Sequence, residues 1–166
     1  MDWFVKAFIK ASVTWLALGV TLGLAIAIHP LWVIYRPAHL HMVLLGFVAM
    51  MIYGVAYHVI PRFVGFPLHS PRAAGLHWWM SNVGLLLMVA GFVVRVRSGA
   101  VVTVLLSAGG ILAALGAYTF AYVLWRTLDG PKRKLARSGV TKSNRPSLPL
   151  VEPSVVTGEK LRQTGG

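Results

Sequence analysis

The chain has 166 residues, of which 57% are hydrophobic and 12% are charged, and its mean hydropathy is +0.70. Soluble domains usually carry about 25% charged residues, and so short a chain cannot bury this much apolar surface in one aqueous core. The composition therefore excludes a disordered chain and predicts a membrane protein. Cysteine is absent, which excludes disulfides, zinc–thiolate sites and cysteine nucleophiles.

The charge balance is strongly basic, with 16 Lys and Arg against 4 Asp and Glu. Such a balance can indicate nucleic-acid binding. Here half of the basic residues follow Pro131, and most of the others stand at the ends of apolar runs. This distribution is typical of membrane topology with a basic tail, so we expect no nucleic-acid partner.

Four apolar runs follow one another, each close to the ~20 residues that cross a bilayer as a helix. They cover about residues 4–29, 38–60, 74–94 and 100–125. The first run is too long for a signal peptide and no small-residue cleavage site follows it, so we expect it to be retained. Because the connections are short and contain prolines, consecutive helices are expected to be antiparallel neighbours. The sequence predicts an all-α integral membrane protein, with a four-helix up-down bundle in a transmembrane domain at 1–130.

The Lys and Arg positions predict the orientation. With the N-terminus inside, the outer loops hold only Arg36, Arg95 and Arg97. The inner segments then hold the remaining cations up to residue 137, which are Lys6, Lys10, Arg62, Arg72, Arg126, Lys132, Arg133, Lys134 and Arg137. This bias places both termini in the cytoplasm. We expect residues 131–166 to form a basic, extended or disordered tail, in contact with anionic lipid or with a partner subunit.

Small residues recur at four-residue steps in the first and fourth runs. The steps are Gly19, Gly23 and Ala27, and Gly109, Ala113 and Ala117. Such spacing lets helix backbones approach closely. Tight packing within one bundle is the favoured interpretation, ahead of a dimer face.

Histidine is the residue most informative about function, because ionisable groups are costly inside a membrane. The predicted topology sorts the six histidines into two layers: His29, His39 and His41 at the outer helix ends, and His58, His69 and His77 at the inner ends. His39 and His58 are separated by about 28 Å of helix, so one cofactor cannot be bound by both layers. A second metal or a quinone head group would suit the inner layer, but interfacial histidines are the simpler interpretation.

The second run suggests a cofactor face. At 100° per residue, Gly46, Met50 and Tyr57 lie on one stripe below His39, while His41 points to nearly the opposite side. A flat macrocycle bound to His39 through iron needs the space that a glycine leaves. In the alternative interpretation, His39 ends a helix near the headgroups and Gly46 serves helix packing.

The stretch 35–91 resembles helices II and III of the catalytic subunit of haem-copper oxidases and nitric oxide reductases. It reads "YRPAHLHMVLLGFVAMMIYGVAYHVIPRFVGFPLHSPRAAGLHWWMSNVGLLLMVAG". The matching parts are an "RP-x-H" entry, a helix with small residues, a proline-arginine exit and an aromatic start to the next helix, namely His39, Gly46, Gly54, Tyr57, Pro61, Arg62, Gly65, Pro67, His77, Trp78 and Trp79. The resemblance implies that His39 is an axial ligand of a low-spin b-type haem, with Arg36 near the propionates. A two-residue shift would give that role to His41.

The departures from the family limit what is expected of the chain. The family's catalytic subunit has about twelve helices, and the helices that supply its other metal ligands have no counterpart here. We therefore do not expect this chain alone to reduce oxygen or nitric oxide, and we assign no catalytic residue. The second axial ligand would be His29, or a residue of a second copy or partner subunit. Without one, a five-coordinate haem would leave a position open for nitric oxide, carbon monoxide or oxygen.

The sequence thus predicts a multi-pass b-type haem protein of the bacterial inner membrane, acting in one-electron transfer or gas response in respiration or denitrification. Its expected partners are membrane lipids, other respiratory subunits or a second copy, and a quinone or cytochrome c as redox partner. The alternative is a cofactor-free structural or assembly subunit of a larger respiratory complex. A transporter or channel is disfavoured, because all four acids lie outside the apolar runs.

Overall fold

The computed structural model describes residues 2–95 and 99–137, with side chains up to Gly130. The described residues form helices and no strands. In chain order these are α1 (Trp3–Ile28), the 3₁₀ helix η1 (Pro30–Tyr35), α2 (Arg36–His41), the π-helix η2 (Met42–Ala49), α3 (Met50–Val64), α4 (Pro71–Val94) and α5 (Gly99–Arg137). Within this part of the chain, 4 helical segments are long and apolar enough to cross a membrane. The predicted all-α membrane fold is confirmed.

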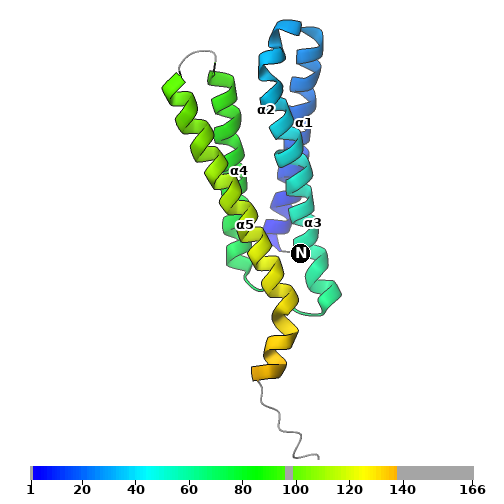
Figure 1. The fold of residues 1–166 in the computed structure, drawn as a ribbon. Helices are drawn as coiled ribbons and strands as arrows, with labels where there is room; N and C mark the ends of the chain where they lie inside the picture. Colours follow the sequence, from blue (N-terminus) through cyan, green and yellow to red (C-terminus); the bar gives the residue numbers. More distant parts are fainter. Residues whose placement is uncertain (1, 96–98, 138–166) are drawn as a thin grey trace, which may run out of the picture.

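The helices form two antiparallel hairpins (Figure 1). The first pairs α1 with the span made of α2, η2 and α3, and the second pairs α4 with α5. The hairpins meet toward the end that carries the connection 65–70, called here the Phe66 end. They diverge toward the end that carries η1, called here the Trp32 end.

The second span differs from its predicted bounds. The stretch after His29 is a 3₁₀ helix and not a loop, with Pro30 in its first turn, where the missing N–H and fixed φ of proline are tolerated. The helix then runs past Pro61 to Val64 and ends at Gly65, whose φ is +69°. A glycine in this left-handed conformation is a common helix stop. The span therefore covers Pro30–Val64, longer at both ends than 38–60.

The π-helical stretch Met42–Ala49 was not predicted. A π-helix has i→i+5 hydrogen bonds, which makes its turns wider than α-helical ones. The rotation of 100° per residue assumed below His39 therefore does not hold through this stretch. π-helical turns often occur at functional sites, and this one lies directly after the two histidines of α2.

The second hairpin also extends beyond its predicted bounds. Pro71 opens α4, and the Ser70 hydroxyl accepts a hydrogen bond from the Ala73 backbone N–H at 3.2 Å, which is a standard N-cap. The helix α5 continues to Arg137, past the predicted end at 125 and into the segment expected to be extended. The rest of that segment lies outside the described residues.

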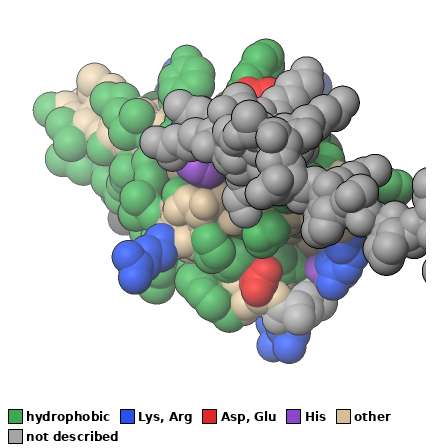
Figure 2. Space-filling model, turned by 90° about the horizontal axis from the view of Figure 1, so that it is seen from below, with side chains coloured by type: hydrophobic (Ala, Val, Ile, Leu, Met, Phe, Trp, Pro, Cys, Tyr) green, Lys and Arg blue, Asp and Glu red, His purple; other side chains and the backbone are tan. Residues whose placement is uncertain are grey.

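An aromatic cluster fills the core near the Phe66 end. It is made of side chains from all four spans, namely Phe4, Phe8, Tyr53, Tyr57, His77 and Phe120. Phe4, Phe8, Tyr57 and His77 are almost completely buried. Figure 2 looks onto this end of the molecule and shows Lys and Arg side chains at the edge of the face. The aromatic part of the core thus lies toward the Phe66 end of the bundle.

Candidate functional site

The imidazole of His39 is held against α1. Its Nδ1 lies 2.8 Å from the carbonyl oxygen of Gly19. Because a carbonyl oxygen can only accept, Nδ1 is the protonated nitrogen and Nε2 carries the free lone pair. Histidines that bind metals usually donate their second N–H in this way, to a carbonyl or carboxylate.

Glycines on α1 make the room for this ring. A Cβ on Gly23 would lie 2.7 Å from Cε1 and 3.4 Å from Nε2 of His39. Gly19, one turn earlier, supplies the accepting carbonyl and packs closely on Val43. The small-residue step on α1 therefore serves packing within the bundle, and it also fixes the orientation of His39.

His29 lies at the end of α1, beyond the level at which the His39 ring packs. His29 ends α1 and is exposed, and its ring lies 5.3 Å from the Trp32 ring. The His39 ring lies at the level of Gly23, about 9 Å from His29 along the helix axis. One iron accepts two axial nitrogens only a few ångströms apart, since each metal–nitrogen bond is about 2 Å.

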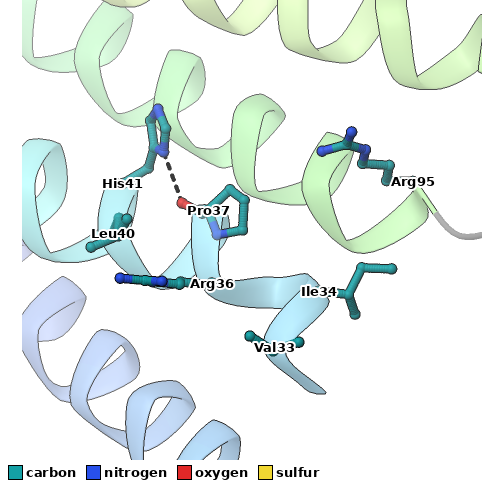
Figure 3. Close-up of a pocket in the computed structure, with 7 residues that line it drawn as sticks. All are labelled: Val33, Ile34, Arg36, Pro37, Leu40, His41 and Arg95. Carbon is teal, nitrogen blue, oxygen red and sulfur yellow. Dashed lines mark hydrogen bonds between the residues drawn. The ribbon is translucent and has the colours of Figure 1, made fainter. Parts of the chain in front are cut away.

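His41 lies on the opposite side of α2, as predicted. Its Nδ1 is 2.8 Å from the Pro37 carbonyl oxygen, which again leaves Nε2 free, and its ring lies 4.9 Å from that of Phe92 on α4. His41 also lines an open groove of about 550 Å³ between the two hairpins. Figure 3 shows this groove, in which Arg95, directly after α4, faces the α2 side. The lining is completed by Val33, Ile34, Arg36, Pro37 and Leu40.

The space expected at Gly46 is occupied by protein. A Cβ on Gly46 would lie 2.6 Å from Cβ of Trp15 and 2.9 Å from a methyl carbon of Leu85. Gly46 therefore lets η2 approach both α1 and α4, as in the packing alternative. Met50 is 1% exposed and belongs to the hydrophobic core.

The three histidines near the Phe66 end do not converge. His58 accepts a hydrogen bond from Arg62 at 2.7 Å on an exposed part of α3, and His69 is exposed in the following connection. His77 is completely buried inside the bundle. Among the described residues, no group of three or more His, Cys, Asp or Glu side chains is placed to hold a metal ion.

His77 forms the one feature of this end that the sequence interpretation missed. Its Nδ1 lies 2.9 Å from the hydroxyl of Tyr57, and both residues are buried. Its Nε2 is buried without a hydrogen-bond partner in the described part of the chain. The available sequence signal was a histidine six residues into an apolar span, well past the helix start at Pro71.

No protein-family model matches the chain. It is 26% identical over 119 residues to a protein of Stutzerimonas stutzeri described as "Cbb3-type cytochrome c oxidase subunit CcoN1", in an alignment that covers 57% of this chain and 25% of that protein. The chain thus spans about a quarter of the length of this relative. The match supports a distant relationship to subunit I of haem-copper oxidases, and it indicates a multi-pass respiratory membrane protein.

Proposed function

We propose that this chain is a b-type haem protein of a bacterial respiratory membrane that serves one-electron transfer, with His39 as an axial ligand of the iron. The observation that carries the proposal is the hydrogen bond from Nδ1 of His39 to the Gly19 carbonyl, which leaves the lone pair of Nε2 available for a metal. The "RP-x-H" entry at 36–39 and the distant match to an oxidase subunit support it.

The residues around His39 fit a haem in their chemistry. Gly19 fixes the tautomer, and Gly23 leaves the ring enough room to keep its orientation. Arg36, three residues before His39 and exposed near the Trp32 end, would pair with a propionate carboxylate. A bound haem would supply one-electron oxidation and reduction, and the protein would tune its potential through ligation and burial.

The second axial position is best assigned to a residue outside this chain's described bundle. His29 follows Gly23, on which the His39 ring packs, by about 9 Å of helix rise, and the space at Gly46 is filled by Trp15 and Leu85. A second copy or a respiratory partner subunit would then supply the second ligand. A quinone or a cytochrome c would act as the redox partner.

His41 is the competing ligand, because it lines a groove of about 550 Å³. Pockets of 300–1,000 Å³ bind cofactors and other small molecules, and apolar walls with arginines at the edge suit a macrocycle with carboxylate arms. The two ligand assignments differ in where they would place the haem. A haem on His41 would lie between the hairpins, whereas a haem on His39 would lie beside α1.

The test is the visible absorption spectrum of the detergent-purified protein, made with haem supplied, oxidised and then reduced with dithionite, with and without carbon monoxide. We expect a Soret band and sharp α and β bands that are lost in His39→Phe and kept in His41→Phe and His29→Phe. The opposite pattern would move the ligand to His41. A reduced spectrum that shifts with carbon monoxide would indicate a five-coordinate, gas-binding haem.

A protein without any Soret band would overturn the haem proposal and favour a cofactor-free structural or assembly subunit. The packing of Gly46 against Trp15 supports that second function. In that case His39→Phe would change stability alone, through the lost hydrogen bond to Gly19.

A further inference from the structure

The groove between the two hairpins at the Trp32 end combines apolar walls with a cation. Its volume is about 550 Å³, and its lining includes Val33, Ile34, Pro37 and Leu40 from the first hairpin and Arg95 from the second. In Figure 3 the guanidinium of Arg95 points across the groove toward α2. In a membrane such a groove is filled by lipid or by protein, because apolar walls that face empty space lose their dispersion contacts.

Arg95 lies at the level of the lipid headgroups. It directly follows α4, which begins at Pro71, so about 36 Å of helix separates the two residues. The hydrocarbon core of a bilayer is about 30 Å thick, and α4 therefore carries Arg95 out of this core at the Trp32 end. A long cationic side chain in such a position reaches the layer of lipid phosphates.

The charge around the groove is positive. Arg36 lines it together with Arg95, and the described side chains include two carboxylates, Asp2 and Asp129. Asp2 lines a pocket at the Phe66 end, and Asp129 lies about 45 Å along α5 from Gly99, at which that helix begins. The groove is therefore complementary to an anion. Guanidinium groups bind phosphate oxygens especially well, through two parallel hydrogen bonds.

The groove is too short for a membrane-spanning helix. At its inner end the ring of His41 lies 4.9 Å from the ring of Phe92 on α4, so the two hairpins touch there. Deeper in the bundle, Gly46 allows η2 to pack on Leu85 of α4. A helix about 10 Å wide occupies roughly 400–600 Å³ per turn, and the groove therefore has room for about one turn. Pockets of this volume bind small molecules.

The groove opens onto an apolar row on the outside of the bundle. Leu40, in the wall of the groove, is followed along the same span by Leu44, Val48 and Ile52, and all four side chains are exposed. Because these positions are four residues apart, they follow one side of the span. A ligand with a long apolar chain can thus keep its anionic head in the groove and lay its chain along this row.

We propose that this groove binds one anionic phospholipid, with its phosphate on the Arg95 guanidinium and an acyl chain along the row that begins at Leu40. Arg36 extends away from Arg95 in Figure 3, so the lipid leaves Arg36 available to a haem propionate. The lipid site is independent of a haem on His39, whereas a haem on His41 would take the same space. The bound lipid bridges the two hairpins at the end where they diverge (Figure 1).

The test is native mass spectrometry of the full chain released from detergent micelles, titrated with phosphatidylglycerol or with the zwitterionic phosphatidylcholine. We expect the first phosphatidylglycerol to bind about 5-fold more tightly than the first phosphatidylcholine, which corresponds to about 1 kcal/mol for one cation. Arg95→Gln should remove this preference. Arg72→Gln is the matched control, because it removes an equally exposed arginine at the other end of α4. Equal binding of the two lipids, or equal losses in the two variants, would overturn the proposal.

Leu40→Trp tests the location of the site without a change of charge. The larger side chain narrows the groove and should weaken the binding of the first phosphatidylglycerol. Leu86→Trp is the control, because Leu86 is exposed on α4 and lies outside the lining of the groove. Equal effects of the two tryptophans would show that the lipid binds elsewhere.

The visible spectrum of the same samples separates this proposal from the haem proposal. Absence of a Soret band would overturn the haem proposal alone, since lipid binding does not require a haem. A Soret band that is lost in His41→Phe would assign the groove to haem and overturn the lipid proposal. A lipid-free dimer that is broken by Leu40→Trp would likewise overturn it, by assigning the groove to a second copy of the chain.

Discussion

Gly84 and Gly109 bring the backbones of α4 and α5 into direct contact. A Cβ on Gly109 would lie 2.7 Å from the Gly84 carbonyl oxygen, and a Cβ on Gly84 would lie 2.9 Å from the Gly109 carbonyl oxygen. Distances below 3.0 Å to backbone atoms cannot be relieved by a side-chain rotation. This pair therefore determines how closely α4 and α5 pack. In lipid, such close packing is the main force that holds helices together.

Gly109→Leu is expected to destabilise the second hairpin by about 1–3 kcal/mol or more, because the added side chain forces the two backbones apart. Gly110→Leu is the matched control, since a Cβ at Gly110 meets nothing within 4 Å. Unfolding of both variants in increasing mole fractions of SDS, followed by circular dichroism, measures the difference. Equal midpoints would show that α4 and α5 are not held by this contact.

The hydrogen bond between Tyr57 and His77 predicts a coupling energy. Tyr57→Phe and His77→Leu should each destabilise the fold, because each leaves a buried polar group unpaired. The double variant should lose less than the two single losses combined. Interhelical hydrogen bonds in membranes are worth about 0.6 kcal/mol on average and up to about 1.7 kcal/mol. A double-mutant cycle from SDS unfolding measures the coupling, and additive losses would mean that the bond contributes nothing.

The sequence was sufficient to predict the four membrane spans and their order along the chain. Apolar runs of about 20 residues have one stable solution in lipid, and that solution is a helix. The ends of the spans were harder to predict, because a proline can lie within the first or last turn of a helix. Pro30 and Pro61 were interpreted as connection residues, yet both are helical in the structure.

For the candidate site, the sequence could predict the types of residue involved but not their arrangement. The opposite orientation of His39 and His41 follows from helical periodicity and is confirmed by their contacts with α1 and with Phe92. The role of Gly46 could not be decided, because a glycine gap looks the same whether a cofactor or Trp15 fills it. His77 was grouped with interfacial histidines, since sequence position gives depth in the membrane but not the side of the helix that faces the core.

Gly23 provides a way to perturb the His39 ring without removing it. A Cβ at this position would lie 2.7 Å from Cε1 of His39, so Gly23→Ala must displace the ring from its hydrogen bond with Gly19. In a haem-loaded protein we expect lower haem content and a shifted α band in the reduced spectrum. Gly110→Ala, which meets open space, should leave both unchanged. An unaltered spectrum in Gly23→Ala would indicate that His39 is not the ligand.

The distribution of cations predicts the orientation of the chain in the membrane. Reporter fusions made in a bacterial host can test it. Alkaline phosphatase should be active when fused between α4 and α5 and inactive when fused after α5, and green fluorescent protein should show the reverse. The reason is that Arg62, Arg72 and Arg126 lie toward the Phe66 end, and Lys and Arg near span ends are retained on the cytoplasmic side.

The same fusions can show that charge is the cause of the orientation. Replacing Arg62 and Arg72 by Ala, together with Lys6 and Lys10, should produce a mixed orientation, because the bias between the two ends is then much reduced. Replacing Arg36 and Arg95 by Ala should strengthen the original orientation. If alkaline phosphatase were active after α5 in the unaltered protein, the Phe66 end would face outward.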